Sequence, residues 1–374
     1  MKRFSWRRAL AIFSKEFKHI MRDPFTLIMA LLLPLTIVLI LGNSIEFNIK
    51  SIHLACVDHD QTESSRRLID TFGSSDYFKT YPLANPGDVH NDIVDERARA
   101  AVVIPPNFEK NFLSATTAPV QVLVDGADNS AIMAIMNYLT IINRNAYFKI
   151  HDIPAYMSRQ NPAMRVRYLF NPELNSRWFS VPGLSAVIIA LVAIMLTTLT
   201  ICREWEQGSM EMLLSTPATS LEIILGKTLP YAILSFLGFV LVFIVARVVF
   251  GVPFVGNYLT LILGTVLFIL GYLGMGLYIS ISTHNQQVAI QYAAVVGLLP
   301  TVILSGFVFP VEYMGRVYQY ISAVFPARFY IDITRDQFLK GSSIASLWPA
   351  FAALAAIAIV LLAACLLRFK RTLE

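Results

Sequence analysis

Six long, almost uncharged apolar runs are the feature that most constrains this chain. About 20 apolar residues in a helix cross the ~30 Å hydrocarbon core of a bilayer, and a helix satisfies its own backbone polar groups there. The 374-residue chain is 56% hydrophobic and only 15% charged, which excludes an ordinary soluble domain. The sequence therefore predicts a membrane all-α protein with six transmembrane helices. The runs are residues 25–42, 181–201, 221–249, 258–282, 288–309 and 347–367.

Basic residues gather before the first run. Residues 1–24 carry seven Lys or Arg against Glu16 and Asp23. An even number of spans puts both termini on one side, and the positive-inside rule makes that side the cytoplasm. Apolar side chains recur on one helical face from Trp6 to Ile20, which predicts an amphipathic helix lying on lipid at the inner leaflet. A basic groove with stacking aromatics is missing from the sequence pattern, so nucleic acid is not an expected partner.

A polar insert follows the first transmembrane helix, which is expected over 25–45. The insert covers 46–178, and helices two to six follow in 179–374. Short β-like runs alternate with helix-like runs in the insert, which predicts a small α/β domain outside the cytoplasm. Strands are expected at Ile52–Val57, Ala100–Ile104 and Val120–Val124, and helices at Thr62–Phe72, Asn107–Ser114 and Asn129–Ile150.

The segment that joins the second and third spans, 203–217, is charged and helix-forming. It reads R-E-W-E-Q-G-S-M-E-M-L-L-S-T-P. On one helix, a polar stripe comprises Glu204, Gly208, Glu211 and Ser215, and Pro217 ends the helix. Charges at bilayer depth are costly, so the segment belongs at the membrane surface. From the residues alone, it either joins two spans or docks a partner protein.

The same segment resembles the R-E-x-E-x-G-T-x-E-x-L-L-x-x-P signature of type-2 ABC transporter permeases, with Ser209 where Thr is usual. In that family it is the cytoplasmic coupling helix that contacts the ATPase subunit. The strings V-D-x-D and V-V-I-P-P-x-F in the insert are similar to the extracytoplasmic domains of drug-export members. The resemblance implies that the ATPase-coupling residues are Arg203, Glu204, Trp205, Glu206, Gly208, Ser209, Glu211, Leu213, Leu214 and Pro217.

The stretch 309–330, before the last span, mixes prolines, glycine and aromatic residues. Its S-G-x-x-x-P and P-A-R-F strings resemble the short re-entrant helices of the same family. A re-entrant hairpin is therefore expected, if the protein buries its backbone. An interfacial outer loop with aromatic anchors is the alternative. The hairpin residues are Ser305, Gly306, Pro310, Pro326 and Arg328.

The sequence pattern does not indicate a nucleotide, metal or catalytic site. The G-K-T string at 226–228 copies the tail of a P-loop, but Leu221 stands where the upstream glycine is required. Lys227 is instead expected to anchor its helix at the inner interface. Residues 58–60, Asp-His-Asp, lack a second pair of ligands for a metal. We expect no cofactor on this chain, and ATP and Mg²⁺ on a separate ATPase.

Polar or adaptable side chains within the spans are candidates to line a transport route. Packing between helices is the alternative for each of them. An ion-coupled carrier usually needs carboxylates in mid-membrane, and these spans show none in the sequence. The candidates are Met195, Thr197, Thr198, Tyr272, Met275, Tyr278, Gln291 and Tyr292.

The predicted function is the permease subunit of an ATP-driven exporter in a bacterial inner membrane, with a hydrophobic or amphiphilic cargo that is drug-like or lipid-like. The resemblance implies an ATPase subunit and a second permease copy, identical or paralogous, and it leaves a periplasmic adaptor open. An ion-coupled carrier and a ligand-sensing membrane protein that uses the outer domain are the alternatives. The identity of the cargo does not follow from the sequence.

Overall fold

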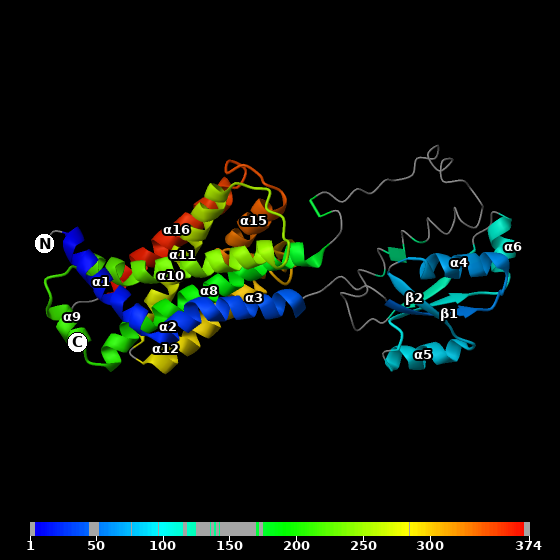
Figure 1. Cartoon of the computed structure of the whole chain (residues 1–374), viewed down its shortest axis with the longest axis horizontal. Helices are drawn as coiled ribbons and strands as arrows, with labels where there is room; N and C mark the ends of the chain where they lie inside the picture. The colour runs from blue at the N-terminus through cyan, green and yellow to red at the C-terminus, as the bar shows by residue number, and fades with distance from the viewer. Residues whose placement is uncertain are drawn as a thin grey trace. The chain divides into compact units, whose positions relative to one another are not determined.

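The computed structural model describes residues 4–44, 52–75, 77–95, 97–114, 118–124, 135, 138–139, 142, 170–171, 175–283 and 285–369. The chain divides into two compact units (Figure 1). The first unit comprises Met1–Ile45 with Leu169–Glu374, and the second comprises Glu46–Tyr168. Each unit has a hydrophobic core of its own.

Among the described residues, six helices are long and apolar enough to cross a membrane, which confirms the predicted number. The first span combines α2 (Pro24–Leu27), a π-helical turn (Ile28–Leu32) and α3 (Leu33–Ser44). The second to fourth are α8 (Ser176–Glu206), α10 (Ser220–Val248) and α11 (Tyr258–Ser282). The fifth combines α12 (Gln286–Tyr292), a π-helical turn (Ala293–Leu298) and α13 (Leu299–Ile303), and the sixth is α16 (Trp348–Arg368).

A separate amphipathic helix, α1 (Trp6–Arg22), precedes the first span. Its buried face carries Ala9, Glu16 and Ile20. Asp23 ends α1, and its Oδ1 accepts hydrogen bonds from the amides of Phe25 and Thr26. The same carboxylate therefore caps α2, where Pro24 occupies the first turn without wasting an amide donor.

Three of the predicted span boundaries were wrong, and the first is the start of the second span, which begins at Ser176 rather than at residue 181. Helix α8 does not stop with its apolar run at Ile201 but continues to Glu206, because charged residues end a hydrophobic pattern without ending helical hydrogen bonding. Its 31 residues extend about 46 Å at 1.5 Å per residue, more than the ~30 Å hydrocarbon core needs. The fifth span ends at Ile303 rather than Phe309, and Gly306 beyond it has a φ of +87°, which glycine adopts without strain.

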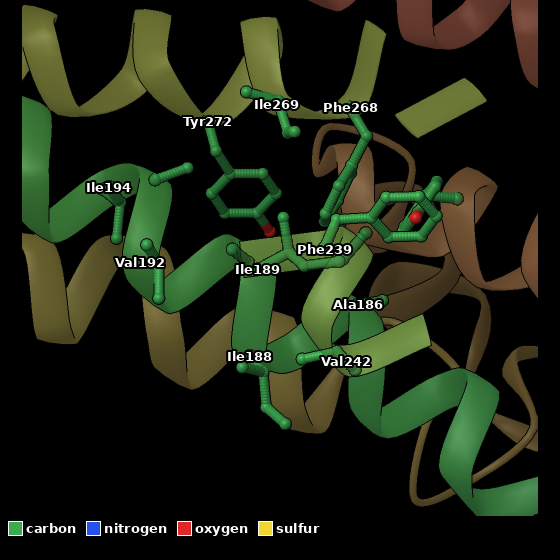
Figure 2. Packing of buried hydrophobic residues seen from close by; sticks show 14 of the residues in the cluster. Ala186, Ile188, Ile189, Val192, Ile194, Phe239, Val242, Phe268, Ile269 and Tyr272 are labelled. Atoms are coloured by element: carbon green, nitrogen blue, oxygen red, sulfur yellow. The ribbon is translucent and has the colours of Figure 1, made fainter. Parts of the chain in front are cut away.

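The core of the first unit is centred on α8 and α11. In the most apolar stretch of α8, 83% is buried within the chain, against 22% of the corresponding stretch in the first, fifth and sixth spans, so α8 is the central helix. A Cβ on Gly276 of α11 would lie 2.6 Å from the carbonyl oxygen of Ile194, so only glycine permits this close approach. Figure 2 shows Ala186, Ile188, Ile189, Val192 and Ile194 packed with Phe239, Val242, Phe268, Ile269 and Tyr272.

The expected hairpin 309–330 consists of a 3₁₀ turn (Val311–Tyr313), α14 (Arg316–Ser322) and α15 (Pro326–Leu339). Its predicted end at 330 was wrong, because α15 continues to Leu339 and buries Tyr330, Ile331 and Ile333 against the bundle. By contrast, α14 is largely exposed.

Each of the five hairpin residues has a defined place. The hydroxyl oxygen of Ser305 accepts from the amide of Phe307, and Arg328 donates to the carbonyl of Gln319. Pro310 precedes the 3₁₀ turn and Pro326 opens α15, while Gly306 supplies the left-handed residue. The sequence missed Arg335, which donates to the carbonyls of Gly306 and Phe307 and so ties α15 to the end of the fifth span.

The second unit is a small α/β domain. The four strands among its described residues are β1 (Ile52–Asp58), β2 (Phe78–Pro82), β3 (Ala100–Ile104) and β4 (Gln121–Val124), in the order β2-β1-β3-β4. Strand β1 is parallel to β2 and β3, and β4 is antiparallel to β3. Helices α4 (Glu63–Gly73) and α5 (Pro86–Val94) cover opposite faces of the sheet (Figure 1), and α6 (Phe108–Leu113) follows β3.

Three strands and two helices of this unit lie within a residue or two of their expected places. Strand β2 and helix α5 were missed. Lys79, Thr80 and Pro82 dilute the apolar signal of β2, and the Pro-Gly-Asp start of α5 is typical of a turn. The helix expected at Asn129–Ile150 lies mostly outside the described residues.

Candidate functional site

The segment 203–217 is not the single helix that the sequence suggested. Helix α8 runs through Glu206, a turn follows, and a short helix α9 covers Met210–Ser215. Gly208 in the turn has a φ of +67°, a left-handed conformation that ends helices and favours glycine. A Cβ on Gly208 would meet open space, so backbone conformation rather than crowding within this chain explains the glycine.

Glu204 points into the protein rather than along an exposed stripe. It is 8% exposed, and its Oε1 lies 2.8 Å from Nζ of Lys15 and 2.9 Å from Nζ of Lys227. The hydroxyl of Ser209 also donates to the Glu204 carboxylate. The predicted stripe of Glu204, Gly208 and Glu211 was therefore wrong, because the turn separates Glu204 from α9.

Lys227 is the centre of this arrangement. It is 1% exposed, and its Nζ lies 2.7 Å from Oε1 of Glu16 as well as 2.9 Å from Glu204. Lys15 also reaches Glu16 at 3.8 Å. Buried charges are tolerated when they are paired in this way. The expectation that Lys227 is an anchor at the lipid interface was wrong: the ion-pair cluster of Lys15, Glu16, Glu204 and Lys227 joins α1, α8 and α10.

A second contact fixes the other end of α1. Glu222 of α10 is fully buried and accepts from Arg8 of α1 at 2.7 Å. The hydrogen bond to Glu222 raises the pKa of Arg8 above its ordinary value. Glu222 also forms a capping box with Thr219, so one carboxylate both begins α10 and holds α1. Between the two contacts, a Cβ on Gly226 would lie 2.7 Å from Cβ of Ile12, so α1 packs closely on α10.

Other residues of the segment also have partners within the chain. Arg203 donates to Asp23 at 3.3 Å. Burial alone would raise the pKa of Asp23, but hydrogen bonds from Thr26 and Arg203 outweigh it, and the pKa lies below its usual value. The carboxylate of Glu206 accepts from the backbone amide of Gln286 at 2.6 Å, which ties the end of α8 to the start of α12.

The segment 203–217 has a packed side and an exposed side. Trp205 and Leu213 are partly buried in an apolar cluster with Met210 and other residues. Glu211, Met212 and Pro217 are exposed, and Met212 is 72% accessible. Among the acidic residues of the segment, Glu211 is the one without a hydrogen bond or ion pair to the described residues. The side chain of Leu214 lies outside the described residues.

The eight candidate route residues fall into two groups. Thr197, Thr198, Tyr272 and Met275 are buried within the bundle. The hydroxyl of Thr198 donates to the carbonyl of Gly276, and the hydroxyls of Tyr272 and Thr301 are hydrogen-bonded to each other, so Thr198 and Tyr272 each contact a neighbouring helix. Met195 lies on the wall of a cavity, and the exposed residues are Tyr278, Gln291 and Tyr292.

In the second unit, the acidic pair at 58–60 supports helix starts. Asp58 accepts from the hydroxyl of Ser65 at 2.6 Å. Asp60 accepts from the amides of Phe108 and Glu109, which satisfies free donors at the start of α6. Burial alone would raise the pKa of Asp60, but these amides and a hydroxyl donor outweigh it and hold the pKa below its ordinary value.

In the described part of the chain, six membrane-capable helices with α8 at their centre, and a short surface helix between the second and third, define a multi-pass helical membrane protein. The chain belongs to the ABC-2 family of transporter permeases: the profile described as "ABC-2 family transporter protein" matches residues 24–367. The resemblance seen in the sequence is confirmed, and the chain is a transporter subunit rather than an enzyme.

Relatives from Escherichia coli strain K12 cover most of the chain. The probable multidrug ABC transporter permease YbhS is 32% identical over 339 residues, which is 90% of each chain. The probable multidrug ABC transporter permease YbhR is 29% identical over 349 residues, 92% of this chain and 94% of YbhR. The inner membrane transport permease YhhJ is 29% identical over 330 residues, 86% of this chain and 85% of YhhJ.

Proposed function

We propose that this chain is the membrane-spanning subunit of an ATP-driven exporter in a bacterial inner membrane, with both termini in the cytoplasm. Its cargo is a hydrophobic or amphiphilic compound taken from the cytoplasm or the inner leaflet. The names of YbhS and YbhR, as probable multidrug permeases, support this cargo class. The observation that carries the proposal is an exposed short helix, α9, mechanically joined to three longer helices.

The exposed residues of α9 form the docking surface for a separate ATPase. Glu211 and Met212 are exposed on a helix whose other side, through Leu213, packs on the bundle. An acidic and an apolar group side by side suit a partner surface with a basic side chain beside an apolar pocket. ATP and Mg²⁺ are handled by that partner.

The ion-pair cluster transmits movement of the docking surface to the spans. Ser209 lies directly before α9 and donates to Glu204, and Glu204 is paired with Lys15 of α1 and Lys227 of α10. A displacement of α9 or α1 therefore acts on the ends of α8 and α10 together. ATP binding can drive such a shift only if the ATPase contacts the two states of the permease differently.

A second permease copy, identical or paralogous, packs against the sparsely buried fifth span. Only 22% of the apolar stretch of this span is buried within the chain, and Val295, Leu299 and Ile303 are each at least half exposed. Gln291 and Tyr292 are exposed on the same span and are candidates to line a route between two copies. The α/β unit lies outside the cytoplasm, where it is available to a periplasmic adaptor.

Reversal of one exposed charge tests the docking surface. We expect Glu211→Lys to lower ATP-dependent efflux by about tenfold or more, because an interfacial charge reversal sets like charges against each other. The control is Glu63→Lys in α4, an exposed glutamate of the other unit. Equal efflux by both variants, at equal membrane levels, contradicts the proposal. Efflux that survives ATP depletion but stops when the proton gradient is dissipated indicates an ion-coupled carrier instead.

A further inference from the structure

A cavity of about 560 Å³ lies beside the ion-pair cluster in the first unit. Its walls come from α1, the first span, α8, α9, α10 and α12. The volume is in the range of pockets that enclose a small organic ligand. The apolar part of the wall includes Met29, Met195, Leu199 and Tyr231, and the polar part includes Lys15, His19 and Arg203.

The basic side chains beside this cavity belong to one stripe of α1. Lys15 lies three residues before Lys18 and four before His19, and Arg22 lies four and three residues after them, so the four share a face of α1. All four are exposed, and Lys15 and His19 line the cavity itself. The stripe therefore continues from the cavity wall, at Lys15 and His19, along the surface of α1 to Lys18 and Arg22.

The acidic groups around the cavity have cationic partners. Glu16 and Glu204 are paired with Lys227 and Lys15, and Asp23 is paired with Arg203. Six charges thus balance as three positive and three negative. Lys18 and Arg22 add positive charge on the same face of α1, so the surface of α1 beside the cavity is net basic.

We propose that this cavity binds one anionic phospholipid of the inner leaflet. One acyl chain lies along Met29, Met195 and Leu199, and the phosphate lies at the basic stripe near Lys18 and Arg22. Methionine side chains adapt to a flexible chain, and basic residues next to the membrane attract anionic headgroups. The proposal rests on the placement of α1 at the inner leaflet, which is part of the proposed function, but it does not require transport.

A phospholipid fits better than a soluble anion because the apolar wall continues onto the first span. Phe25 lines the cavity and is 59% exposed, and Ile28, one turn further along, is 50% exposed. A chain can therefore enter sideways from the surrounding lipid. Ser209 and Met212 also line the cavity, so a bound lipid contacts the coupling segment as well as α1.

Native mass spectrometry of the purified full-length protein tests the site, with added phosphatidylglycerol or phosphatidylcholine as the probe. We expect one phosphatidylglycerol to bind preferentially to the wild-type protein. Leu199→Trp fills the cavity and should weaken this binding about tenfold or more. The control is Leu229→Trp on α10, where the leucine is 48% exposed and does not line the cavity.

The headgroup contact is tested by a second set of variants that leaves the cavity intact. Lys18→Ala and Arg22→Ala should each lower the preference for phosphatidylglycerol about fivefold. Arg7→Ala removes the same charge from α1 about 16 Å away along the helix and should change the preference little.

Equal binding of the two lipids to the wild type, or unchanged binding by Leu199→Trp, overturns the proposal. Preferential binding of an uncharged amphiphile in the cavity also overturns the proposal and favours a cargo site. The outcome is separable from the proposed function, because Glu211→Lys should lose efflux and still retain phosphatidylglycerol.

Discussion

Replacement of Lys227 by methionine tests whether the ion-pair cluster holds α1 to the bundle. The ammonium group is 1% exposed and lies within 2.9 Å of two buried carboxylates, those of Glu16 and Glu204. Lys227→Met keeps most of the side-chain volume but leaves these carboxylates with one shared cation. Lys15 then remains at 2.8 Å from Glu204 and 3.8 Å from Glu16.

The expected loss follows from the charge that stays behind. Removal of one partner from a buried ion pair costs about 3–5 kcal/mol. Because Lys15 still reaches Glu204, we expect the lower end, about 3 kcal/mol in the free energy of unfolding. Glu16→Gln in the same chain removes the orphaned charge and should restore about 1–2 kcal/mol, a coupling that a double-mutant cycle measures.

Denaturant titration of the purified protein in detergent micelles measures these changes. The control is Lys18→Met, an exposed lysine of α1, which should shift the free energy of unfolding by less than about 0.5 kcal/mol. If Lys227→Met is as stable as Lys18→Met, or if Glu16→Gln makes the Lys227→Met protein still less stable, the cluster does not hold the helices together.

Three further variants test local features of the fold. Gly208→Ala forces a Cβ into a left-handed turn and should cost about 1–2 kcal/mol of stability by denaturant titration; no loss contradicts the turn. Gly226→Val sets a side chain against Ile12 and should detach α1, seen as faster proteolysis of residues 4–22, whereas unchanged digestion contradicts the packing. Because the pKa of Asp60 lies below its ordinary value, its carboxylate stabilises the folded α/β unit at neutral pH, and this stabilisation is lost as the pH falls through that pKa. Asp60→Asn should therefore remove this part of the acid sensitivity of the α/β unit. An unchanged acid transition in the variant argues against it.

The membrane-spanning part of the fold could be predicted because its signal is simple. A run of uncharged residues predicts a helix of sufficient length whatever its neighbours are, and all six runs are helical. Helix ends were less predictable: α8 continues past Ile201 into a charged turn, and the fifth span stops before Gly306. Hydropathy marks where lipid ends, not where hydrogen bonding ends.

The ion-pair cluster could not be found from hydropathy alone. Lys227 appears as one cation in an apolar helix, which is equally typical of an interface anchor. A signal was nevertheless present in α1, where Glu16 lies one turn before Ile20 on the face that the structure buries. A carboxylate on a buried face requires a cation from another helix, but the sequence does not say which one.

The segment 203–217 also depends on contacts that hydropathy does not reveal. Its residues identified the family, but the placement of Glu204 and Glu206 depends on Lys15, Lys227 and Gln286, which are distant in sequence. The glycine signal was available: Gly208 just after a run of helix-forming residues is typical of a left-handed helix end. It would have separated Glu211 from the two other acids.

Labelling of position 211 from each side of the membrane tests most directly whether a separate ATPase docks on α9 from the cytoplasm. The three native cysteines, Cys56, Cys202 and Cys365, are buried, so Glu211→Cys supplies an accessible thiol. A membrane-impermeant maleimide should label it in inverted vesicles stripped of peripheral proteins, and not in intact spheroplasts. If an ATPase co-purifies with the chain, as the proposed function requires, adding it back should block the labelling. Labelling from the outer side, or labelling that the ATPase leaves unchanged, would contradict the proposed coupling.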